Sequence, residues 1–163
     1  EIRGKADYFP LREGSPVATG PKSDLRDELI YFLDPTDAND PLLLTFDEFG
    51  SPQPAVSEGE DKWTYERVTT TIKYLHLDYR PLVDERKKIW NTCSRLIDKA
   101  QNLMKEQGES PSVTRKTEID NIFNELRERI SVEAELSSTA RACLLSRGIT
   151  GNIQWVMNLV SRP

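Results

Sequence analysis

The single histidine, His76, has the side chain most easily assigned a chemical role. An imidazole can act as a general base near neutral pH, and Asp78 or Asp84 could assist it in a hydrolase. No cysteine or second histidine stands near it at metal-ligand spacing. A histidine at the end of a helix also caps or packs there, because its cation meets the helix dipole favourably. We expect this structural role for His76, and catalysis by His76 is the less favoured alternative.

Carboxylates gather in the stretch "DPTDANDP", which contains Asp34, Asp37 and Asp40. The spacing is superficially that of a calcium-binding loop, but the central glycine and terminal glutamate of an EF-hand are missing. Asp and Asn in loops commonly accept hydrogen bonds from nearby backbone N–H groups. We therefore predict a solvated loop and no metal site. No glycine-rich phosphate loop or serine elbow is present either, so the residues alone predict no complete catalytic site.

Composition limits the class of protein. Cys93 and Cys143 form no CxxC pair and lie on apolar helical faces, which predicts buried thiols in a reducing cytoplasm. The net charge of −5 disfavours a broad DNA footprint, because phosphate neutralisation by Lys and Arg supplies most of such affinity. No apolar run approaches the ~20 residues of a membrane span, so we expect no membrane association.

The first half of the chain predicts little regular structure. Residues 1–27 are rich in Gly, Pro and charge, which indicates an irregular segment. The apolar runs 29–33 and 42–46 predict two short strands that pair as a small antiparallel sheet. Gly50 to Pro54 should then break the chain, and helical spacing of apolar residues predicts a helix over 65–76.

The second half predicts a helical bundle. A long helix should begin near Pro81 and end at Gly108, since proline is favoured in a first turn and glycine at a C-terminus. A third helix is expected over 117–136 and a fourth around Cys143, with Gly148 as its cap, before a last short helix near Trp155. The fold class is thus α+β, mostly α. One compact domain would comprise residues 1–27, the strand-pair region 28–79 and the bundle 80–163.

A series of short motifs follows one order along the chain: "GKADYFPL", "GSPVATGP", an acid before an apolar run ending in "DP", "LTFDEFGSPQP" and "TTTIKYLHLDYRPLVDERKKIW". This string resembles the C-terminal half of the HNH endonucleases of bacterial antiphage defence. That family includes the nuclease subunit of Septu-type systems and retron-associated nucleases. The resemblance covers roughly residues 3–90, and its specificity lies in the order of the motifs.

The resemblance implies a ββα-metal core with an acid–histidine pair, a divalent metal (Mg or Mn) and a structural Zn held by two cysteine pairs. That core would lie upstream of residue 1, since this chain has no such histidine or cysteine pairs. The exit of the core is matched by Lys5, Asp7, Phe9, Pro10 and Leu11. Arg3 and Lys5 are then candidate contacts to nucleic-acid phosphates, or simply solvated charges. The family's helix start is matched by Leu77, Arg80 and Leu82.

Two functions remain open. The first is a portion of an HNH-type, metal-dependent nuclease of phage defence that cleaves nucleic acid. The second is a non-catalytic helical module that binds a partner or associates with itself through the faces of helices 81–107 and 117–136. The resemblance implies an ABC-type ATPase as the partner subunit. Both readings place the protein in the cytoplasm.

Overall fold

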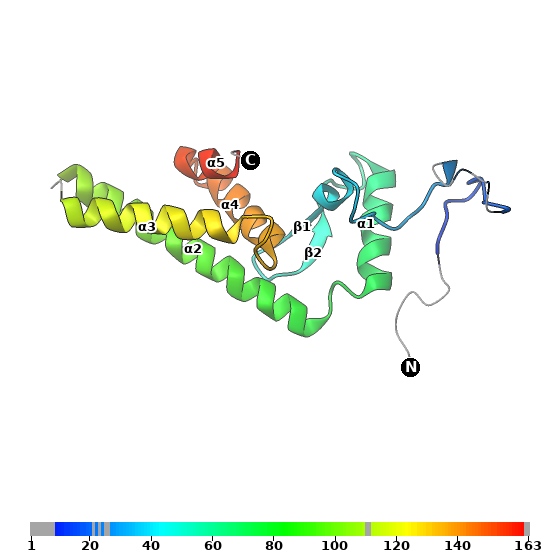
Figure 1. Cartoon of the computed structure of the whole chain (residues 1–163), viewed down its shortest axis with the longest axis horizontal. Coiled ribbons are helices and arrows are strands. Elements are labelled where there is room, and N and C mark those ends of the chain that lie inside the picture. The colour runs from blue at the N-terminus through cyan, green and yellow to red at the C-terminus, as the bar shows by residue number, and fades with distance from the viewer. Residues whose placement is uncertain (1–8, 21, 23, 25–26, 110–111, 162–163) are drawn as a thin grey trace. The chain divides into compact units, whose positions relative to one another are not determined.

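The computed structural model describes residues 9–20, 22, 24, 27–109 and 112–161. The predicted class is confirmed, because the structure is α+β and mostly α, with five helices and one two-stranded sheet in its described part (Figure 1). The chain divides into two compact units. Unit 1 comprises residues 1–45 and 52–80, and unit 2 comprises residues 46–51 and 81–163. The predicted start of the bundle, residue 80, lies one residue before the main part of unit 2.

Unit 1 is organised around one helix, α1 (Lys62–Leu75). Asp61 begins it by accepting a 3.0 Å hydrogen bond from the Thr64 N–H, which satisfies a donor that the first helical turn leaves open. The predicted helix over 65–76 is therefore confirmed, with a start three residues earlier. Val68 and Thr71 are buried on its inner face. The Thr71 hydroxyl donates to the Arg67 carbonyl and accepts from the Leu33 N–H, so a threonine is accommodated there without an unpaired polar atom.

The prediction that the runs 29–33 and 42–46 pair as two strands is wrong, because the second run pairs with a different segment. β1 (Leu44–Phe46) pairs with β2 (Pro52–Pro54), the segment expected to break the chain, after the 3-10 turn η2 (Asp40–Leu43). A tight turn makes this possible. The Asp47 carboxylate accepts from the N–H groups of Phe49 and Ser51, at 2.9 and 2.8 Å.

The run 29–33 is not a regular strand. Only Ile30 forms an isolated antiparallel bridge, with Leu11. The carbonyl groups of Ile30 and Phe32 instead accept hydrogen bonds from the Arg67 side chain. For these two carbonyl groups, the Arg67 side chain thus takes the place of the strand neighbour that the apolar pattern predicts.

Unit 2 contains four helices: α2 (Arg80–Glu109), α3 (Val113–Arg129), α4 (Ser137–Thr150) and α5 (Gln154–Val160). The long helix is confirmed within one residue at each end. Ion pairs join neighbouring helices, from Lys99 on α2 to Glu118 on α3 at 2.6 Å and from Asp98 on α2 to Arg147 on α4. The core is apolar and comes from all four helices and the turns beside them: Trp90, Cys93, Leu96, Ile97, Ala100, Ile119, Ile122, Leu126, Ile130, Ala140, Cys143, Leu144, Ile153, Val156 and Leu159.

Two helix ends in unit 2 differ from the sequence prediction. α3 ends at Arg129 instead of residue 136, and Leu136 has a left-handed backbone with φ 53° at the start of α4. Gly148 does not cap α4, because the helix continues to Thr150 with Gly151 as its C-cap. A Cβ atom at Gly148 would lie 2.5 Å from the Met157 sulfur. This glycine therefore serves the close packing of α4 on α5.

The hairpin turn of residues 46–51 packs on α2 within unit 2. The Arg86 guanidinium, on a residue only 4 % exposed, lies 4.6 Å from the centre of the buried Phe46 ring. Burial lowers the pKa of Arg86, although an arginine stays charged over the physiological range. Gly50 has φ +83°, and a Cβ atom there would lie 2.2 Å from the Val83 carbonyl oxygen. Only glycine fits this contact without displacing backbone.

Candidate functional site

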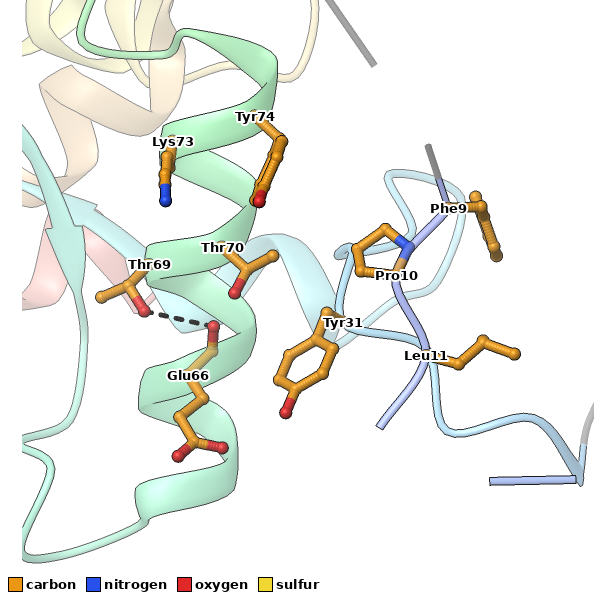
Figure 2. A pocket seen from close by; sticks show the side chains of 9 residues that line it. All are labelled: Phe9, Pro10, Leu11, Tyr31, Glu66, Thr69, Thr70, Lys73 and Tyr74. Atoms are coloured by element: carbon orange, nitrogen blue, oxygen red, sulfur yellow. Dashed lines mark hydrogen bonds between the residues drawn. The ribbon is translucent and has the colours of Figure 1, made fainter. Parts of the chain in front are cut away.

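A groove of about 660 Å³ lies in unit 1, beside the segment that the resemblance identifies as the exit of the nuclease core. One wall is the polar face of α1, and the other is the extended segment Phe9–Leu11 with Tyr31 (Figure 2). In this view Tyr31 lies between α1 and the segment that carries Pro10 and Leu11. The lining residues are Phe9, Pro10, Leu11, Tyr31, Glu66, Thr69, Thr70, Lys73 and Tyr74.

Backbone hydrogen bonds hold the two extended segments of the groove together. The Tyr31 N–H donates to the Pro10 carbonyl at 3.1 Å, and the Arg12 N–H donates to the Leu29 carbonyl at 2.9 Å. Phe9 meets the buried Phe32 edge-on, with ring centres 5.8 Å apart. Pro10 is itself buried. Two of the candidate residues from the motif exit, Phe9 and Pro10, therefore form part of the wall of the groove.

Arg67 fixes the same wall to α1. Its guanidinium donates to both carboxylate oxygens of Asp40, at 2.8 and 2.5 Å, and to the carbonyls of Ile30 and Phe32 at 3.1 and 3.2 Å. The side chains of Arg67 and Asp40 are 17 % and 13 % exposed. The hydrogen bonds from Arg67 hold the pKa of Asp40 below its ordinary value. One arginine thus ties the "DP" loop and the 30–32 segment to one helix.

The carboxylates of the stretch "DPTDANDP" accept hydrogen bonds within their own loop, as the sequence predicts. Asp34 accepts hydrogen bonds from the N–H and hydroxyl of Thr36, and these bonds lower the pKa of Asp34. Asp37 accepts from the N–H groups of Asn39 and Asp40, at 2.7 and 3.0 Å. The carboxylates are used in turns, which confirms the interpretation as a hydrogen-bonded loop.

The described lining of the groove has polar groups that can bind a ligand. Among these residues Glu66 is the one carboxylate and Lys73 the one ammonium, which lies 5.2 Å from the centre of the Tyr74 ring. The Thr69 hydroxyl donates to backbone carbonyls of α1 at 2.9 and 3.1 Å, so its proton is already committed. Aromatic rings beside a cation and hydroxyls suit a ligand with a flat or extended polar body.

His76 lies at the C-cap of α1 with a left-handed backbone, φ 52°, and its N–H donates to the Ile72 carbonyl. This position confirms the prediction that His76 lies at the C-terminal end of a helix and caps it. The described part of the chain has no ion pair or side-chain hydrogen bond between His76 and Asp78, so the hydrolase pair is not assembled in unit 1. Asp84 lies in the other unit.

Three predicted candidates, Arg3, Lys5 and Asp7, lie outside the described residues. Among the residues that are described, no cluster of three or more His, Cys, Asp or Glu side chains could hold a metal ion. None of the described helices has the length and apolar character to cross a bilayer.

Sequence reasoning missed most of the groove. Glu66, Thr70 and Lys73 recur at helical spacing on the face of α1 opposite the buried Val68 and Thr71. That polar periodicity in the sequence could have predicted the wall of the groove that α1 forms. No such sequence signal identified Tyr31, because the apolar run around it predicts a strand.

Comparisons of the chain with protein-family models, with curated proteins and with solved structures found no match.

Proposed function

We propose that this chain is the C-terminal portion of an HNH-type nuclease of bacterial phage defence, acting in the cytoplasm on nucleic acid. The observation that carries the proposal is the order of the five motifs over roughly residues 3–90. A single motif of this kind is a weak signal, whereas the ordered set is specific.

The contacts within unit 1 support this reading. Leu11 of the first motif bridges Ile30 of the apolar run, and Asp40 after the "DP" turn binds Arg67 just before the threonine run. The Leu33 N–H reaches the hydroxyl of Thr71 at 3.0 Å. Motifs far apart in sequence therefore serve one framework, which explains why they would occur together and in order.

The chemistry of phosphodiester hydrolysis is assigned to a core upstream of residue 1. A one-metal nuclease needs a divalent ion at the scissile phosphate and a positioned general base. The described residues do not fit such a metal or the structural zinc, since they contain no ligand cluster. In the proposal, unit 1 supports the core, and its groove lies where the core helix exits at Phe9. Arg3 and Lys5 would contact phosphates near that exit.

The test compares two proteins. The intact mass and N-terminal sequence of the native polypeptide are measured against the 18.6 kDa of this chain. Both proteins are then incubated with Mg²⁺ or Mn²⁺ and with duplex DNA, single-stranded DNA or RNA. The proposal expects an upstream segment with a histidine and two cysteine pairs, and cutting by the native polypeptide alone. A native polypeptide that lacks those residues would overturn it.

A second candidate is a non-catalytic module that binds an ABC-type ATPase or a second copy of itself. Exposed apolar residues on α4 favour it, because Leu145 and Ile149 are 40 % and 68 % exposed and lie one turn apart. Exposed apolar side chains one turn apart on a helix are typical of a docking face. The test is co-purification of the chain with an ABC-type ATPase expressed together with it, and measurement of the solution mass of the chain alone. Leu145→Glu should abolish either association, and a strictly monomeric chain that captures no ATPase would exclude this candidate.

A further inference from the structure

A second cavity, of about 310 Å³, lies in unit 2 where the turn between α3 and α4 meets α5. Two arginines line it, Arg127 from the last turn of α3 and Arg141 from α4. Its floor includes the buried Ile130 and Leu159. Ser131, Val132 and Glu133 complete the lining. The cavity therefore combines two permanent cations with an apolar floor.

The partners of these two arginines differ from those of their neighbours. Arg129 forms an ion pair with Glu125 at 2.8 Å, and Arg147 forms one with Asp98. Arg127 donates only to the neutral Asn124 side chain, at 3.0 Å. The Arg141 side chain makes no hydrogen bond or ion pair in the part of the chain that the structure describes. Two guanidiniums thus line one cavity without a carboxylate partner.

Glu133 lines the same cavity and offsets only part of its positive charge. In the described structure no ion pair within 4.0 Å joins Glu133 to either arginine. The cation pair is therefore still available to an anion that enters the cavity. A guanidinium presents several N–H donors in a planar fork that matches the oxygens of phosphate, and such charged hydrogen bonds are stronger than neutral ones.

We propose that this cavity binds the phosphoryl group of a small phosphate monoester. A dianionic phosphoryl group matches two guanidiniums in charge, and Ser131 offers a further donor beside them. The apolar floor at Ile130 and Leu159 suits a short carbon body attached to the phosphate. The volume lies at the lower end of the range for small-molecule sites, which fits a ligand of this size.

A nucleic-acid strand is the less suitable occupant. A strand extends beyond a small cavity, and here it would meet Glu133 in the lining as well as Glu128 and Glu135, which stand next to lining residues or close to them in the sequence. The chain as a whole carries a net charge of −5, which repels a polyanion over a longer range. A small ligand inside the cavity meets the two cations and the single lining carboxylate of Glu133, so the charge around it is still positive. This inference is independent of the proposed nuclease, because it uses residues outside the motif string.

The experiment is a calorimetric titration of the whole chain with glycerol phosphate and with inorganic phosphate, at constant ionic strength with chloride as reference. We expect saturable binding of one equivalent. Arg127→Gln and Arg141→Gln should each weaken it about tenfold or more, since each removes a charged hydrogen bond of about 1.5–3 kcal/mol. Arg95→Gln is the matched control, because it removes the same charge from an exposed position on α2 outside the cavity.

Two further variants strengthen the test. Glu133→Gln should tighten binding, because it removes the one negative charge that lines the cavity. Arg141→Lys should keep part of the affinity and guards against a fold defect in Arg141→Gln, which thermal unfolding also monitors. Absence of saturable binding up to about 20 mM, or equal loss in Arg95→Gln, would overturn the site. Tighter binding of a single-stranded oligonucleotide through the same arginines would overturn the small-ligand assignment.

Discussion

Replacement of Arg67 by Met should loosen the framework of unit 1 while leaving unit 2 intact. Arg67 makes four hydrogen bonds, to two carboxylate oxygens of Asp40 and to the carbonyls of Ile30 and Phe32. Methionine keeps much of the apolar stem but supplies none of these donors. The variant therefore leaves a largely buried carboxylate and two carbonyl groups without their partner.

The magnitude follows from burial. Breaking one partner of a fully buried ion pair costs about 3–5 kcal/mol, and exposed pairs contribute about 0–1 kcal/mol. With 17 % and 13 % of the two side chains exposed, we expect about 2–3 kcal/mol for Arg67→Met, between the exposed and the fully buried ranges and closer to the buried one. The control is Arg129→Met, which breaks the Arg129–Glu125 pair, 36 % and 43 % exposed, on α3. This control should cost at most about 0.5 kcal/mol.

Hydrogen–deuterium exchange resolves the effect by segment. The reporters are the N–H groups of Leu33 and Asp34, which donate to Thr71 and Asp40. A loss of 2–3 kcal/mol corresponds to exchange about 30- to 150-fold faster in residues 29–43, with α3 unchanged. Equal acceleration by the Arg129→Met control, or no acceleration in residues 29–43, would refute the role given to Arg67.

The same ion pair predicts a pH dependence. Because hydrogen bonds from Arg67 depress the pKa of Asp40 in the folded state, its contribution is complete above the ordinary value of 3.8. The contribution is lost as the pH falls through the lower, folded-state pKa. The stability difference between wild type and Arg67→Met should therefore be constant from about pH 7 to 5 and shrink below about pH 4. A difference that stays constant to pH 3 would contradict the assignment.

Further substitutions test three backbone positions, Gly50, Gly148 and His76. In urea unfolding, Gly50→Ala should destabilise unit 2 by at least about 2 kcal/mol, because its Cβ would overlap a carbonyl oxygen of α2. The control Gly14→Ala also has a positive φ, +79°, but its Cβ would enter open space, so it should cost only about 1 kcal/mol. Gly148→Ala should cost less than Gly50→Ala, since its clash is with the flexible Met157 side chain, and Met157→Ala should remove part of that cost in a double-mutant cycle. His76→Gly should leave helix content and thermal midpoint unchanged or slightly raised, because glycine adopts φ 52° without strain; a large loss would show that the imidazole itself is needed.

The helices were predictable because their signal is local. The apolar face of α2 repeats every three or four residues from Trp90 through Ala100, and that period alone identifies the helix and its buried side. The hairpin was not predictable in this way. Pro52 and Pro54 lack N–H groups and resemble chain breakers. The turn stabilised by Asp47 and the Ala55 N–H, which donates to the Leu43 carbonyl at 2.8 Å, nevertheless hold this segment beside β1. Turn chemistry outweighed strand propensity there.

The candidate site shows the same limit more strongly, because its walls depend on contacts between distant residues. The run 29–33 has the composition of a strand, and its actual conformation follows from Arg67, 37 positions from Ile30 along the chain. No local pattern reports that an arginine side chain will replace a strand as hydrogen-bond partner. Once Arg67 holds the carbonyls of Ile30 and Phe32, Tyr31 lies between them in sequence and lines the groove opposite α1. The groove therefore depends on Arg67 together with the backbone hydrogen bonds between residues 10–12 and 29–31, and the Arg67→Met experiment tests the site and the framework together.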